Sequence, residues 1–119
     1  MKLYQYNKCG SCRKAANWMT KNEIKFDSLP IRDCPPSREE LRALLDSHNG
    51  QIKKLFNTSS RDYRVTEIKE RIPSMTEEEI IELLHQNGNL NKRPILLGPG
   101  IFLQGFNEVA WAAALLNNP

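Results

Sequence analysis

Polar and apolar residues alternate with two different periods along this chain of 119 residues. Segments with a period of two are typical of half-buried strands, and apolar residues three and four positions apart are typical of amphipathic helices. The first kind of segment predicts a strand at about residues 2–6, and further strands are predicted at about residues 24–29 and, on either side of a turn, at 95–97 and 101–104. The second kind predicts helices at about residues 11–21, 37–49, 52–56, 64–71, 76–87 and 107–116.

Short polar motifs mark where several of these elements begin and end. Ser37-Arg38-Glu39-Glu40 and Thr76-Glu77-Glu78-Glu79 have the capping-box pattern, in which a hydroxyl and a carboxylate satisfy the first amides of a helix. Asn107 is the expected N-cap of the last helix. Gly98-Pro99-Gly100 predicts a turn between the last two strands, which therefore form a hairpin.

The order of the elements predicts an α/β fold. The first strand, helix and second strand form a βαβ unit, which requires a parallel pair with a right-handed crossover. The hairpin completes a four-stranded mixed sheet, and we expect helices on both of its faces. The helices between the second and third strands form an all-helical insertion at about residues 37–88. We expect a single domain over residues 1–119, with its core at about residues 1–33 and 89–119.

Composition restricts the classes of function. The formal charge of +3 is compatible with an anionic substrate or an acidic protein partner, but no Lys/Arg cluster indicates direct nucleic-acid binding. No apolar run reaches the ~20 residues of a membrane span, and the N-terminus has a strand pattern rather than that of a signal peptide. Three cysteines, an odd number, argue against a secreted disulfide framework. We therefore expect a cytoplasmic protein with reduced thiols at rest.

Cys9-Gly10-Ser11-Cys12 carries the candidate chemistry because it lies between a predicted strand and a predicted helix. The first turn of a helix has unpaired amides and a dipole that favour negative charge. At such a site the pKa of a cysteine falls from ~8.5 to ~3.5–7.5, which increases the share of the reactive thiolate. We interpret Cys9 as a redox nucleophile and Cys12 as its resolving partner.

Two alternatives to redox chemistry stay open for this motif. A zinc site would need a second pair of ligands, but Cys34, His48 and His85 lie far apart and form neither a second CxxC nor an HxxxH. We therefore expect no metal. The two cysteines of the motif could also be inert and packed on an apolar face.

The residues around the motif predict how an anion or a thiolate is stabilised. The amides of Ser11 and Cys12 face the expected position of the Cys9 sulfur, and Gly10 allows a bulky partner to approach closely. Arg13 can bind an anion in a bidentate way, whereas the neighbouring lysines are more typical of solvated surface charge.

Two segments far along the chain add candidates to the same site. Arg93-Pro94 precedes the third strand, where Arg93 can stabilise an anion or a thiolate and a cis bond at Pro94 would turn backbone groups toward the sulfur. A salt bridge from Arg93 to the insertion is the alternative. The polar groups at residues 57–63, beginning with Asn57, could line the rim of the pocket or form a plain loop between helices.

Several motifs together carry a resemblance to a known family. They occur in the family's order over essentially the whole chain, at residues 6–15, 35–41, 56–63, 92–95 and 105–108. On these motifs the chain resembles the arsenate reductase ArsC/Spx family. The resemblance implies a thioredoxin-like fold with a helical insertion.

The resemblance also implies which residues act on a substrate. Arsenate reductases of this family that depend on glutaredoxin use one nucleophilic cysteine, at the position of Cys9, and three arginines around the oxyanion. Arg93 matches one of these arginines, while Asn57 and Gly105 stand at the other two positions. A pocket with a single arginine predicts weak binding of a doubly charged oxyanion such as arsenate.

Two functions follow from the resemblance. One is a thiol–disulfide oxidoreductase of arsenate reductase type, which binds no cofactor and is reduced by thioredoxin or by glutathione and glutaredoxin. The alternative is a redox-sensing regulator of Spx type, which binds the RNA polymerase alpha subunit and switches by a Cys9–Cys12 disulfide. The chain has the CxxC of Spx without its basic C-terminal tail. A third alternative is a protein that retains the fold of the family but has lost the activity of its site. We expect a monomer.

Overall fold

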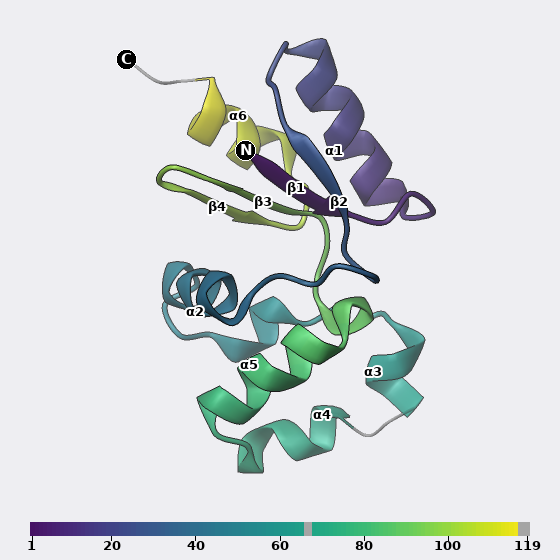
Figure 1. The fold of residues 1–119 in the computed structure, drawn as a ribbon, viewed down its shortest axis with the longest axis vertical. Coiled ribbons are helices and arrows are strands. Elements are labelled where there is room, and N and C mark those ends of the chain that lie inside the picture. The colour runs from purple at the N-terminus through teal and green to yellow at the C-terminus, as the bar shows by residue number, and fades with distance from the viewer. Residues whose placement is uncertain (66–67, 117–119) are drawn as a thin grey trace. The chain divides into compact units, whose positions relative to one another are not determined.

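The computed structural model describes residues 1–65 and 68–116 (Figure 1). The chain forms two compact units. The first contains Met1–Pro30 and the chain from Arg93 onward, and the second contains Ile31–Lys92.

The first unit holds the sheet and two helices. Its elements are β1 (Lys2–Gln5), α1 (Gly10–Lys21), β2 (Asp27–Pro30), β3 (Ile95–Gly98), β4 (Ile101–Gln104) and α6 (Glu108–Leu115). In the second unit the described elements are helices joined by loops, with one isolated β-bridge between Phe56 and Asn91. Its elements are α2 (Arg38–Ser47), η1 (Ile52–Leu55), α3 (Arg61–Val65), α4 (Ile68–Arg71), η2 (Ile72–Ser74), α5 (Glu77–Gln86) and η3 (Gly88–Leu90). In the described ranges, no helix has the length and apolar character needed to cross a membrane.

The sheet is mixed and four-stranded, as the order of elements predicted. Its strand order is β2-β1-β3-β4, with β1 parallel to β2 and antiparallel to β3. The β3–β4 hairpin is antiparallel. In the register, Leu3 lies opposite Ser28 on one side and Leu96 on the other. The central position of β1 matters for the site, because the motif follows directly after this strand.

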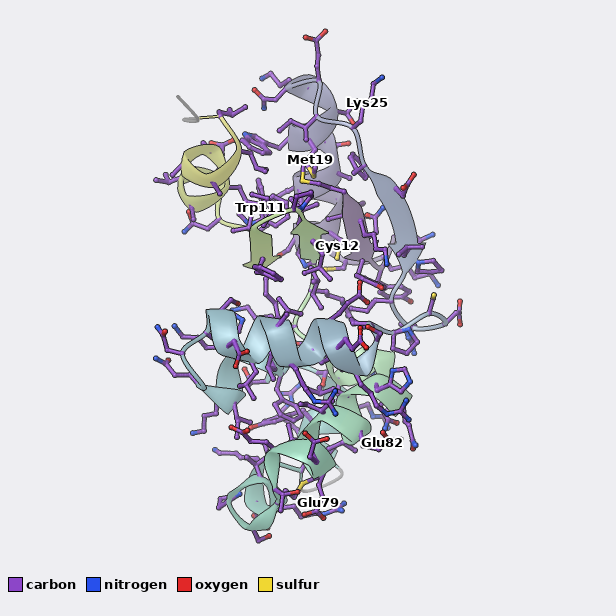
Figure 2. All side chains as sticks on the ribbon, turned by 60° about the vertical axis from the view of Figure 1, so that its left-hand side comes forward. Cys12, Met19, Lys25, Glu79, Glu82 and Trp111 are labelled. Atoms are coloured by element: carbon purple, nitrogen blue, oxygen red, sulfur yellow. The ribbon has the colours of Figure 1, made fainter. Side chains whose placement is uncertain are left out.

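Both helices of the first unit cover the same face of the sheet (Figure 1). Figure 2 shows the side chains of Met19 from α1 and Trp111 from α6, which pack in one core cluster with Leu3 and Leu96. The sequence predicted helices on both faces of the sheet, and within the first unit α1 and α6 lie on one of them. The packing side of α6 could not be read from its pattern because this helix is apolar nearly all round, and the structure shows that Trp111 turns inward.

The second strand is shorter than its pattern predicted. A turn at residues 22–23 follows α1, where Glu23 has a positive φ of 58°, and residues 24–26 are an irregular segment that leads to β2. The amide of Ile24 donates to the carbonyl of Met19 at 2.9 Å, and Ile24 and Phe26 pack against the core, so their apolar character reflects partial burial outside a strand. The helix predicted over residues 64–71 is described as α3 and α4, and its residues 66–67 lie outside the described part.

In the second unit both predicted capping boxes are formed. The Ser37 hydroxyl accepts from the amide of Glu40 at 3.1 Å, and the Thr76 hydroxyl accepts from the amide of Glu79 at 3.2 Å. Two ion pairs, Arg38–Glu82 and Arg42–Glu78, join the helices that these boxes begin. Both pairs are exposed, so they add little to stability, and the buried leucines and isoleucines of α2 and α5 hold the helices together.

We predict that Gly88→Ala destabilises the protein strongly. A Cβ at this position would lie 1.8 Å from the carbonyl oxygen of Ile31, and that oxygen belongs to the backbone and cannot move aside easily. The free energy of unfolding, measured in urea, should fall by at least about 2 kcal/mol. Gly10→Ala is the matched control, because a Cβ there meets nothing within 4 Å. Equal losses in the two variants would contradict the close packing of η3 on Ile31.

Candidate functional site

Cys9 lies at the junction that the sequence predicted, between β1 and α1. It is the N-cap of α1 with an extended backbone at φ −94° and ψ 122°, and its carbonyl accepts from the amide of Arg13 at 3.1 Å. Its own amide donates to the carbonyl of Tyr6 at 3.0 Å. The side chain is half-buried. A partly accessible sulfur therefore lies at the positive end of the α1 dipole.

Cys12 is one helical turn further and is fully buried. It shares the inward face of α1 with Ala15 and Met19, and Figure 2 shows it beside the strands. The amide of Tyr6 donates to Cys12 Sγ at 3.4 Å. Both thiols are free in this structure. The motif thus places one sulfur at the surface of the unit and one in its interior.

The surroundings of Cys9 favour its thiolate. Partial burial acts against the charged form, but the thiol and amide of Cys12 and then the Arg93 guanidinium outweigh it. The pKa of Cys9 is therefore lowered from the ordinary value of a cysteine. A larger fraction of Cys9 is ionised near neutral pH than in a free thiol, which makes it the better nucleophile.

The surroundings of Cys12 have the opposite effect. Burial raises the pKa of Cys12 to about 12, and the neighbouring Cys9 adds to the increase, whereas the Tyr6 amide and Arg93 oppose it. Cys12 therefore stays protonated while Cys9 ionises. The pKa values of the two thiols in this motif are thus shifted in opposite directions.

Arg93 and Pro94 belong to the same unit as the cysteines, and the bond between them is cis. The Arg93 guanidinium carbon lies 5.0 Å from the centre of the Tyr6 ring. The carbonyl of Pro94 accepts from the amide of Gly105 at 2.8 Å. The structure thus brings Arg93 to the two sulfurs, where its charge acts on both thiols.

Gly105 has a backbone that an arginine would not adopt easily. Its φ is +76°, and its carbonyl accepts from the indole N–H of Trp111 at 3.0 Å. This conformation explains in physical terms why a side chain is disfavoured at one of the positions where the resemblance implies an arginine.

The other predicted site residues are placed as follows. Gly10 and Ser11 form the exposed start of α1, and the space beside Gly10 is open. Arg13 is exposed on the same helix and is not among the groups that shift the Cys9 pKa. Asn57 belongs to the second unit, where its amide donates to the carbonyl of Leu90 at 2.8 Å. It borders a hollow of about 290 Å³ whose lining includes three lysines, at positions 53, 54 and 92.

Sequence reasoning gave Tyr6 no role in the site and used it only as a strand residue and as the start of the family motif at residues 6–15. The signal was available, because an aromatic residue close before the motif and an arginine before the third strand lie together once β1 pairs with β3.

The third cysteine, Cys34, is exposed in the second unit. His85 faces the carbonyl of Pro36 at 2.9 Å through Nδ1. Among the described residues, no three His, Cys, Asp or Glu side chains gather as metal ligands.

Comparison with known proteins places this site in a family. The model of the ArsC family matches residues 4–114. The chain belongs to the ArsC family. This family resemblance covers both units and confirms the family predicted from the motifs.

The relatives of this ArsC family chain differ in their described roles. The uncharacterized protein YusI of Bacillus subtilis is 41% identical over 106 residues, covering 89% of this chain and 90% of that protein. The global transcriptional regulator Spx of Streptococcus pyogenes is 30% identical over 106 residues, covering 89% and 78%. The crystal structure of a possible arsenate reductase from Streptococcus mutans is 32% identical with a TM-score of 0.82, covering 88% and 89%. This structural similarity shows that the chain has the thioredoxin-like fold of the ArsC family.

We predict that Arg93→Gln raises the pKa of Cys9, because it removes the positive charge that stabilises the thiolate. In a Cys34→Ser background, alkylation of Cys9 by iodoacetamide at about pH 6 should slow several-fold, and the rates should converge at high pH. Lys14→Gln is the control, because it removes an exposed cation of the same helix that is not among the groups acting on Cys9. Equal slowing in both variants would mean that general surface charge, rather than Arg93, sets the acidity of Cys9.

Proposed function

We propose that this protein is a thiol–disulfide oxidoreductase resembling arsenate reductase, in which Cys9 is the nucleophile and Cys12 the resolving thiol. One observation carries the proposal. The pKa of Cys9 is lowered and that of Cys12 is raised to about 12, although the two sulfurs lie within one turn of helix. Two inert cysteines would have no reason to differ in this direction, because burial alone raises the pKa of both.

The first step is attack by the Cys9 thiolate on a sulfur of an oxidised substrate, such as a disulfide. A Cys9–substrate disulfide forms, the substrate's own S–S bond breaks, and one substrate sulfur leaves as a thiolate that takes up a proton. Cys12 then loses its proton and attacks Cys9 Sγ, which expels the second substrate thiol. Counted from the two protonated thiols, the Cys9–Cys12 pair has given up two electrons and two protons, and the substrate has gained them.

The acidity of Cys12 favours this order of events. While Cys9 is a thiolate, its negative charge and its hydrogen bond help to keep the proton on Cys12. Once Cys9 is in a mixed disulfide, that charge is gone, whereas Arg93 still favours the ionised form of Cys12. The resolving thiol therefore becomes easier to deprotonate only after the first bond has formed.

The cycle needs an external dithiol or thiol to reduce the Cys9–Cys12 disulfide, and we assign this role to thioredoxin or to glutathione with glutaredoxin. No bound cofactor is required. A doubly charged oxyanion would meet only Arg93 among the three arginine positions of arsenate reductases, since the others are Asn57 and Gly105. We therefore favour an oxidised sulfur substrate over arsenate itself.

A second candidate is a redox-sensing regulator of Spx type, in which the same disulfide is a switch instead of a catalytic intermediate. The likeness to the transcriptional regulator Spx of Streptococcus pyogenes, at 30% identity, favours it. In this alternative the partner is the RNA polymerase alpha subunit, and oxidation changes the affinity for it. Both candidates place the working protein in the reducing cytoplasm.

We predict that replacement of Cys12 traps the intermediate. In a Cys34→Ser background, Cys12→Ser mixed with oxidised glutathione should keep one glutathione on Cys9, because no second thiol can expel it. With Cys12 present, the product should be the internal disulfide. Rapid-quench mass spectrometry separates the two products by mass. Cys9→Ser is the control and should form little adduct, since Cys12 is buried and protonated. An unmodified Cys9 in the Cys12→Ser variant would refute the proposal.

The regulator is tested separately by binding. If it is correct, the reduced and oxidised proteins should bind the C-terminal domain of the polymerase alpha subunit to different extents in a pull-down, because the disulfide is the switch. Cys12→Ser, which cannot close the disulfide, should bind to the same extent under both conditions. Absence of binding in both redox states would remove this candidate without affecting the oxidoreductase.

A further inference from the structure

We infer that Tyr6 is a positioning residue of the redox site, whose ring holds the Arg93 guanidinium beside the two sulfurs. The inference rests on the proposed function, in which Cys9 is the nucleophile. Tyr6 is the first residue after β1 and is half-buried. It contacts Cys12 through its amide, Cys9 through its carbonyl and Arg93 through its ring.

The backbone of Tyr6 fixes its own position relative to the cysteines. Its amide donates to Cys12 Sγ at 3.4 Å, and its carbonyl accepts from the amide of Cys9 at 3.0 Å. Hydrogen bonds thus connect Tyr6 to both cysteines across the turn between β1 and α1. These two bonds fix the backbone position from which the Tyr6 ring projects.

The strand register brings Arg93 to this ring. β1 and β3 pair antiparallel with Tyr4 opposite Ile95, after Lys2 opposite Leu97 and Leu3 opposite Leu96. Continuing the same register by two residues places position 6 opposite position 93. The guanidinium carbon of Arg93 lies 5.0 Å from the ring centre, within the range of a cation–π contact.

Stacking and hydrogen bonding use different parts of a guanidinium. The aromatic ring takes its face, while its N–H donors point outward in the plane and stay available to other groups. Arg93 can therefore rest on Tyr6 and donate toward Cys9 at the same time, and its hydrogen bond and charge both act on the Cys9 thiol. A long, flexible side chain held in this way needs to lose less conformational freedom when the thiolate forms. A lysine, as a point charge without a planar fork, would not combine the two contacts.

The test is the pH profile of Cys9 alkylation by iodoacetamide in a Cys34→Ser background. Tyr6→Leu should shift the profile to higher pH and slow alkylation at about pH 6 by about two- to fivefold, the size expected for one cation–π contact. Rates at high pH should be unchanged, because the thiolate itself is intact. Tyr6→Phe keeps the ring and should restore the wild-type profile. Phe102→Leu, which removes an exposed ring of β4, should leave the profile unchanged.

A double-mutant cycle separates positioning from a general loss of structure. If Tyr6 acts through Arg93, then Tyr6→Leu has no further effect on the profile once Arg93→Gln is present. An equal shift in both backgrounds would overturn the inference. Arg93→Lys gives a second measurement if Tyr6→Leu folds poorly, since it retains the charge and the ring. This variant should alkylate more slowly than wild type at about pH 6, and a wild-type rate would also overturn the inference.

The outcomes distinguish this inference from the proposed function. An ordinary pKa for Cys9 in the wild-type protein would refute both. A lowered pKa in the wild type that persists unchanged in Tyr6→Leu would refute only the role of Tyr6 and leave Cys9 as the nucleophile.

Discussion

The turn from β1 into α1 places two sulfurs one helical turn apart in different surroundings, and the chemistry of the site depends on that difference. Cys12 falls on the inward stripe of α1 with Ala15 and Met19, so the helical period buries it completely. Cys9 is the N-cap, where the chain has not yet turned into the helix, and it stays half-buried. Burial raises the pKa of both thiols, but at Cys9 the thiol and amide of Cys12 and the Arg93 guanidinium outweigh it, whereas at Cys12 it prevails. Neither pKa shift needs an unusual backbone at the motif, because the period of α1 and the place of its N-cap separate the two thiols.

The positive charge at the site comes from the topology of the sheet. Arg93 is far from the motif in sequence, but β3 lies beside β1 as its antiparallel neighbour, which brings the start of β3 to the end of β1. The amide of Gly105 donates to the carbonyl of Pro94, and the Trp111 indole N–H donates to the carbonyl of Gly105. These two hydrogen bonds attach the loop that carries Arg93 to the core of the unit. The pairing of β1 with β3 fixes the position of the Arg93 charge better than an exposed helix surface fixes that of Arg13.

The sequence predicted the features that depend on local pattern. The mixed sheet, both capping boxes, the hairpin and the Asn107 cap all follow from spacing and turn residues, and the structure contains each of them. It could not predict features set by long-range contacts. Ile24 and Phe26 looked like strand residues because partial burial in an irregular segment gives the same apolar signal, and α6 had no distinct polar face to orient it. The proximity of Tyr6 and Arg93 becomes visible in the sequence only when β1 and β3 are known to pair, and that pairing is a long-range contact.

Within the candidate site, residue types limit what the thiolate can attack. A doubly charged oxyanion needs several fixed cations, and this chain supplies Arg93 while Gly105 has a backbone that disfavours a longer side chain. The Arg93 guanidinium also lies over the Tyr6 ring and lowers the pKa of the Cys9 thiol, so its charge already stabilises a group of the protein itself. A neutral disulfide requires no such charge, because only a thiolate and a nearby proton-bearing partner are needed to exchange it. Catalyst and sensor share this requirement, and the lifetime of the Cys9–Cys12 disulfide against cellular reductants is the physical quantity that separates them.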